Sequence, residues 1–259
     1  MLIGSALDDL FPKISKESDR GMTQTDPHNR KMTWRSIDAV RVTTTVFGIY
    51  AGLLGMEHGY FETLQGSVVP TSMRIMAVSG PGLPFPFGHE PAMTVIPNFL
   101  VTGILAILVG MSIILWSVAF VHKKHGATVL SLLSILLLLV GGGFGPISLL
   151  IAACIGAGRI NKPHTWWRKN LSAGPKRLLA TLWPWSLAAS LGWVPVEVVL
   201  GQIFHLKNDS NQTLTNLNFL FSYPLLFFVA TSLIAGFAHR AHSLPEEENT
   251  DVVCSDNRG

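Results

Sequence analysis

Charged residues are scarce in this chain. Asp, Glu, Lys and Arg together make up 14% of its 259 residues, whereas 48% are hydrophobic. A soluble domain of this length would bury fewer apolar residues and expose more charged ones. The composition therefore excludes an ordinary soluble domain and favours a protein that lies in the lipid bilayer. The net charge of +3 arises from basic residues flanking the apolar segments, so it does not indicate nucleic acid as a partner.

Cysteine is also scarce, and the motifs of common enzyme classes are absent. Cys154 lies in an apolar segment and Cys254 near the C-terminus, so the chain has no disulfide framework. No G-x-G-x-x-G or P-loop spacing occurs, which excludes the usual phosphate-cradling loops. The zinc-protease motif H-E-x-x-H is missing too. The sequence therefore predicts an architecture rather than a reaction, and a role other than enzyme is the better prediction.

Long apolar segments are what the chain has in abundance. Four of them can cross about 30 Å of hydrocarbon: residues 42–64, 94–121, 178–204 and 217–238. A fifth, residues 127–158, is broken at its centre by glycine and proline. Polar tails, residues 1–38 and 242–259, flank this transmembrane domain of residues 39–241. We predict an all-α, polytopic transmembrane helix bundle with four clear spans and a central, broken helical hairpin.

The positions of lysine and arginine predict the topology. If residues 127–158 formed one span, the basic residues would divide almost evenly between the two sides of the membrane. If the segment enters and leaves on the same side, 17 of the 19 share one side, and only Arg74 and Lys207 lie on the other. Because such residues stay cytoplasmic, we predict a returning hairpin in the plasma membrane with both termini inside. Each half is about 20 Å long as a helix, so a re-entrant hairpin and two short spans both remain open.

The break in the hairpin is the first candidate functional segment. It contains Gly141, Gly142, Gly143, Gly145 and Pro146. Glycine permits positive φ angles, and proline lacks an N–H, so the helical hydrogen bonding must be interrupted here. Broken helices at membrane depth line ion and substrate paths in transporters, although a tight turn between two helices needs the same residues. A simple turn is therefore the preferred interpretation of the break, and a substrate or ion path is the functional alternative.

Ionisable residues near the ends of the first two spans form a second candidate group. They are Glu57, His58 and Glu62 in the first segment, and His89 and Glu90 just before the second. His58 and Glu62 are four residues apart and so share a helix face. Imidazole and carboxylate groups suit a divalent metal, and the same groups can relay protons. Solvated or hydrogen-bonded side chains at the membrane interface are the preferred interpretation, and a metal or proton role is the alternative.

Glycines at four-residue intervals or nearly so, at Gly48, Gly52, Gly55 and Gly59, predict close packing of the first span against another helix. The partner is either another helix of this chain or a second copy.

Three stretches resemble an uncharacterised family of prokaryotic polytopic membrane proteins. They are GMEHGYFETLQG at residues 55–66, GHEPAMTVIPNFLVTGILAILVG at 88–110 and LLVGGGFGP at 138–146. The resemblance covers roughly residues 40–185, and it implies membrane residence without a mechanism.

The preferred function is a small-solute or ion transporter, or a component of one. One alternative is an outward-facing, metal-dependent membrane enzyme that uses His58, Glu62 and His89; the other is a non-catalytic accessory subunit. The expected partners are the lipid bilayer and, as options, a second copy or a membrane complex. No cofactor is evident apart from the candidate divalent metal.

Overall fold

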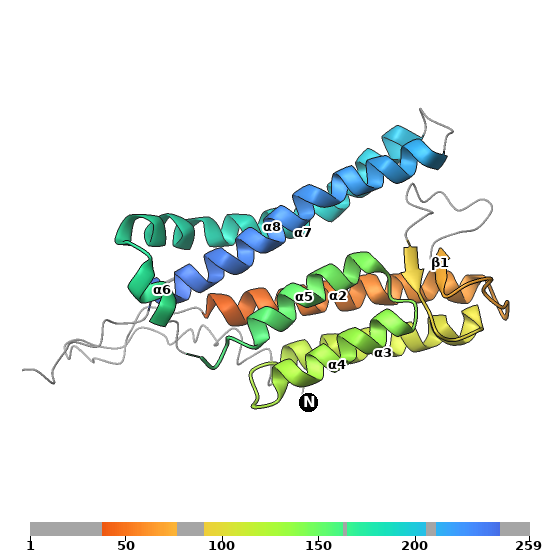
Figure 1. Ribbon diagram of the computed structural model, residues 1–259, viewed down its shortest axis with the longest axis horizontal. Helices are drawn as coiled ribbons and strands as arrows, with labels where there is room; N and C mark the ends of the chain where they lie inside the picture. Colours follow the sequence, from red (N-terminus) through yellow and green to blue (C-terminus); the bar gives the residue numbers. More distant parts are fainter. Residues whose placement is uncertain (1–37, 77–90, 163–164, 206–210, 244–259) are drawn as a thin grey trace, which may run out of the picture.

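The computed structural model describes residues 38–76, 91–162, 165–205 and 211–243 (Figure 1). This part of the chain forms seven helices and a small antiparallel sheet. The helices are α2 (Ala39–Leu64), α3 (Phe99–Ala119), α4 (Gly126–Leu139), α5 (Phe144–Ala157), α6 (Thr165–Asn170), α7 (Ala173–His205) and α8 (Asn211–Ser243), and the strands are β1 (Arg74–Met76) and β2 (Pro91–Met93). Nearly all of the two predicted tails, and the candidate residues His89 and Glu90, lie outside the described residues.

Three helices of the described chain are long and apolar enough to cross a membrane. They are α2, α3 and the Ser222–Ser243 part of α8. Helices α4 and α5 are apolar but have only 14 residues each. The set fits an integral membrane protein, but the prediction of four clear spans is not confirmed. The predicted span 178–204 lies within α7, which is not among these three helices of the described chain.

The second predicted span, residues 94–121, starts later than expected. Asn98 caps α3, because its side-chain oxygen accepts a hydrogen bond from the Val101 N–H at 3.2 Å. The residues before the cap are extended: β2 pairs with β1, and Thr94 bridges to Val140. A helical start at Thr94 was therefore wrong, since these residues form a short segment that lies across the connection between α4 and α5.

Helices α2 and α3 pack closely along a seam of small residues. A Cβ added at Gly52 would lie 2.8 Å from the Gly110 carbonyl oxygen, and one added at Gly59 would lie 2.6 Å from that of Gly103. Thr45 adds a hydrogen bond to the Ser117 carbonyl at 3.2 Å. Close approach of this kind needs glycine on both helices. The partner of Gly48, Gly52 and Gly59 is thus α3 of the same chain, whereas Gly55 faces Leu137 of α4.

Helices α4 and α5 form a hairpin whose two ends meet at the end of the bundle where α2 begins. Asn161, just after α5, donates to the His122 carbonyl before α4 at 2.9 Å. At the opposite end, the Val140 carbonyl accepts a hydrogen bond from Thr102, in the first turn of α3, at 2.8 Å. The hairpin therefore runs almost the full length of α3.

Helices α7 and α8 pair along their length and join the bundle at the same end. Arg240 of α8 donates two hydrogen bonds to the carboxylate of Asp38, the N-cap of α2, at 3.0 and 3.1 Å. The Trp183 indole of α7 donates to the Thr43 hydroxyl at 2.8 Å. This end carries ten of the eleven described lysine and arginine residues, and Arg74 on β1 lies at the other end. The apolar bundle thus has one strongly basic end.

Candidate functional site

The two candidate groups that the sequence suggested separately meet in one place. Glu62 and His58 lie in the last two turns of α2, with 0% and 3% of their surfaces exposed. The connection between α4 and α5 packs directly against them. A Cβ added at Gly141 would lie 2.6 Å from Cδ of Glu62, and one added at Gly143 would lie 2.6 Å from Cδ2 of His58. The break in the hairpin is therefore the surface that covers these two ionisable side chains.

The backbone at the break adopts conformations that favour glycine. Gly141 has φ +91° and Gly143 has φ +77°, both in the left-handed region. The Gly142 N–H donates to the Leu137 carbonyl at 2.9 Å, which closes the end of α4 as in a common C-terminal cap. Gly143 is the N-cap of α5. The chain thus reverses within a few residues, and the absence of Cβ atoms lets its backbone touch α2.

Gly145 and Pro146 belong to the first turn of α5. The N–H groups of a first helical turn have no partner within the helix, so proline is tolerated there. The Gly145 carbonyl accepts a hydrogen bond from the Ser148 hydroxyl at 2.7 Å. These two residues therefore start the helix that follows the break.

A chain of hydrogen bonds holds the break in position. The Thr102 hydroxyl donates its one hydrogen to the Val140 carbonyl at 2.8 Å. Towards the Thr94 hydroxyl, 2.7 Å away, Thr102 is therefore the acceptor and Thr94 the donor. The Ile96 N–H donates to Thr94 at 3.1 Å, and the Gly141 N–H donates to the Met93 carbonyl at 2.9 Å. Both threonines are buried. These two threonines were not singled out from the sequence, although a hydroxyl in the first turn of an apolar span is a candidate for a hydrogen bond to a neighbouring segment.

The tautomer of His58 follows from one hydrogen bond. Its Nδ1 lies 2.9 Å from the Leu54 carbonyl oxygen, which can only accept, so Nδ1 carries the hydrogen. In a neutral imidazole the other nitrogen, Nε2, is then an acceptor. The Nε2 side of the ring faces Gly143. The site therefore presents a nitrogen lone pair next to the break.

Glu62 is the unusual group of the site. Both of its carboxylate oxygens are buried, and neither has a hydrogen-bond partner within the described part of the chain. An ionised carboxylate in such surroundings costs several kcal/mol or more unless it is paired. Glu62 is therefore stable as the neutral acid, beside a bound cation, or beside a protonated His58, which is close enough to interact with its charge. This is the chemistry of a group that takes up and releases a proton or cation.

Glu57 lies apart from this site. It is half-buried and shares a helix face with Tyr50, seven residues earlier, whose hydroxyl donates to the Leu191 carbonyl of α7 at 3.2 Å. The described residues contain no group of three His, Cys, Asp or Glu side chains arranged to hold a metal ion. A metal site that uses His58 and Glu62 would need further ligands such as His89 and Glu90, so it stays a prediction from the sequence.

No protein-family model matches the chain, and comparisons with curated proteins and with solved structures gave no match either. The roles proposed below therefore rest on the geometry of this chain's own residues.

Proposed function

We propose that this protein is a membrane transporter that moves a proton or a small cation, alone or together with a small solute, and that Glu62 binds the transported ion. The observation that supports this is the fully buried Glu62 carboxylate, which contacts the Gly141 backbone and has no hydrogen-bond donor among the described residues. Ionisable groups in transmembrane segments are costly and typically serve ion or proton pathways.

The depth of the site supports the proposal. Thr102, which holds the break, is the fourth residue of α3, so the break lies about 5 Å from the first residue of that helix along its axis. The site is therefore near one boundary of the apolar layer. With the basic end of the bundle placed in the cytoplasm, as positive residues favour, Glu62 is close to the outer surface. A cation from outside would cross only a short distance to reach it.

The contact with the hairpin gives binding a structural consequence. Gly141 and Gly143 pack against Glu62 and His58 without intervening atoms. Buried surroundings that stabilise a neutral carboxylic acid do not stabilise a bare carboxylate equally well. A change in the charge of Glu62 therefore changes the stability of the contact between its carboxyl group and the break. The α4–α5 hairpin is therefore the element whose position would respond to the ion. Transporters use broken helices around a fixed site in this way.

Proton flux into proteoliposomes tests the proposal. The purified full chain is reconstituted with an internal pH-sensitive dye, and a potassium diffusion potential with valinomycin drives the flux. We expect a protein-dependent flux that Glu62→Gln reduces at least about tenfold, because the amide cannot exchange a proton. The matched control is Glu197→Gln, which removes a half-buried carboxylate from α7, a helix that contributes none of the site residues.

The same vesicles are tested with a sodium gradient and a sodium-sensitive dye. Flux of neither ion above that of protein-free vesicles would contradict the proposal. So would an equal loss of flux in the Glu62 and Glu197 variants.

A further inference from the structure

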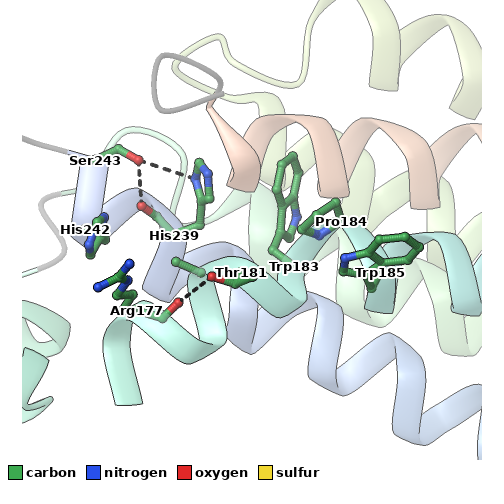
Figure 2. Close-up of a pocket in the computed structure, with 9 residues that line it drawn as sticks. Arg177, Thr181, Trp183, Pro184, Trp185, His239, His242 and Ser243 are labelled. Carbon is green, nitrogen blue, oxygen red and sulfur yellow. Dashed lines mark hydrogen bonds between the residues drawn. The ribbon is translucent and has the colours of Figure 1, made fainter. Parts of the chain in front are cut away.

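A second site lies at the basic end of the bundle, far from Glu62. A pocket of about 330 Å³ opens between the first part of α7 and the last turns of α8 (Figure 2). Its lining residues are Arg177, Ala180, Thr181, Trp183, Pro184, Trp185, His239, His242 and Ser243. The volume is within the range of small-molecule sites. Nothing in the proposed transport path uses this pocket.

The charge of the pocket favours an anion. Arg177 is permanently positive, and the imidazoles of His239 and His242 supply further N–H groups. Figure 2 shows Arg177 and His242 at the same end of the pocket. None of the described lining residues is acidic, and Asp38, the acid that reaches this part of α8, is bound by Arg240 at 3.0 Å. A guanidinium group beside neutral donors is well suited to phosphate oxygens.

The surface next to the pocket is apolar and suits an acyl chain. Leu178, Leu182 and Trp185 are 62%, 40% and 73% exposed. They are spaced at i, i+4 and i+7, so they form one stripe along α7 that begins beside Arg177 and ends at the pocket residue Trp185. A soluble phosphate compound would use the basic pocket but not this stripe. A phospholipid would use both.

We propose that this pocket binds the headgroup of an anionic phospholipid of the inner leaflet, with Arg177 and His242 on the phosphate and one acyl chain along Leu178, Leu182 and Trp185. Two features of the protein agree with this occupant. The basic end of the bundle is where anionic headgroups gather, and exposed tryptophan is typical of the membrane interface.

Native mass spectrometry of the detergent-purified full chain tests the proposal. The protein is titrated with phosphatidylglycerol, and phosphatidylcholine, which has no net charge, is titrated in parallel. We expect one phosphatidylglycerol molecule to bind, with phosphatidylcholine at least about tenfold weaker. Arg177→Gln should weaken phosphatidylglycerol binding about tenfold or more, the usual effect of losing a charge-assisted hydrogen bond.

Lys124→Gln is the matched control, because Lys124 is an exposed basic residue of the α3–α4 connection, at the same end of the bundle but outside the pocket. The affinity of the Lys124→Gln variant for phosphatidylglycerol should stay within about twofold of that of the unmodified protein. Thr181→Leu keeps every charge and fills the pocket, so it should also weaken binding. It provides a second variant if Arg177→Gln does not yield folded protein.

Three results would overturn the proposal. Equal losses with Arg177→Gln and Lys124→Gln would mean diffuse attraction to a basic surface. Equal binding of the two lipids would remove the role of charge. Displacement of phosphatidylglycerol by inorganic phosphate or glycerol phosphate at matching concentration would identify the ligand as a soluble phosphate compound.

Discussion

Replacing Gly141 with alanine tests the contact on which the site depends. Gly141 has φ +91°, a conformation that costs a residue with a Cβ about 1–2 kcal/mol. The added methyl would also lie 2.5 Å from Oε2 of Glu62 and 2.6 Å from its Cδ, so the carboxyl group must move. Crowding of this kind in a packed interior costs about 1–3 kcal/mol. We expect Gly141→Ala to lower the free energy of unfolding by about 2–5 kcal/mol.

A double-mutant cycle separates these two contributions. Glu62→Ala removes the carboxyl group that the new methyl would strike, so Gly141→Ala in that background should cost only the backbone part. The expected coupling is about 1–3 kcal/mol, typical of residues in contact. Gly66→Ala is the control, because Gly66 has φ +75° but no atom within 4 Å of an added Cβ. It should cost about 1–2 kcal/mol whether or not Glu62 is present.

The free energies come from reversible SDS titration in mixed micelles, followed by tryptophan fluorescence. Costs of Gly141→Ala that agree within about 0.5 kcal/mol in the two backgrounds would refute the reasoning, because independent sites add. They would mean that the Glu62 carboxyl group does not rest against the break, and the proposed transport site would lose its main support.

Three further predictions concern the fold and topology. Gly59→Leu should lower the melting temperature sharply, because an added Cβ strikes the Gly103 backbone. Gly192→Ala should not lower it, because an added Cβ there meets nothing within 4 Å. Thr102→Val should lower the free energy of unfolding by about 1–3 kcal/mol in the SDS titration, since it leaves a buried carbonyl without its donor; an unchanged midpoint would contradict this. In chains whose two native cysteines are replaced, Ser172→Cys should react with an impermeant maleimide only after cells are permeabilised, whereas Ser72→Cys, at the opposite end of the bundle, should react at once. The reverse labelling pattern would show that the protein has the opposite orientation in the membrane.

The sequence predicted the elements of the bundle better than their ends. Long apolar runs identified α2, α3 and the last part of α8, because transfer to hydrocarbon depends mainly on composition. The start of α3 was misplaced because Asn98 caps it, and because the preceding residues pair with β1 and, at Thr94, with Val140, which local sequence does not reveal. The predicted span 178–204 was recovered as the long helix α7, but α7 is not among the three candidate spans of the described chain.

The candidate site was predicted as two groups and observed as one. Glycine spacing identified the break, and residue chemistry identified His58 and Glu62, each from local sequence. Their contact joins residues about eighty positions apart, and helix packing determines it rather than any local pattern. The threonine chain from Thr94 to Val140 was missed for the same reason, because a single hydroxyl in an apolar segment most often bonds its own helix.

The position of the buried acid explains why the break must be made of glycine. Glu57 and Glu62 are both on α2, but Glu62 is the one that lies under the turn between α4 and α5, where a side chain at Gly141 would fill the space beside it. A simple turn between two helices needs positive φ at one residue and no contact with an acid. Here two residues with positive φ face two ionisable side chains, and one of these has no hydrogen-bond donor among the described residues. Stability alone would favour an apolar residue at position 62, since a buried unpaired carboxyl group is costly. Its presence is therefore better explained by the proposed ion binding than by a contribution to stability.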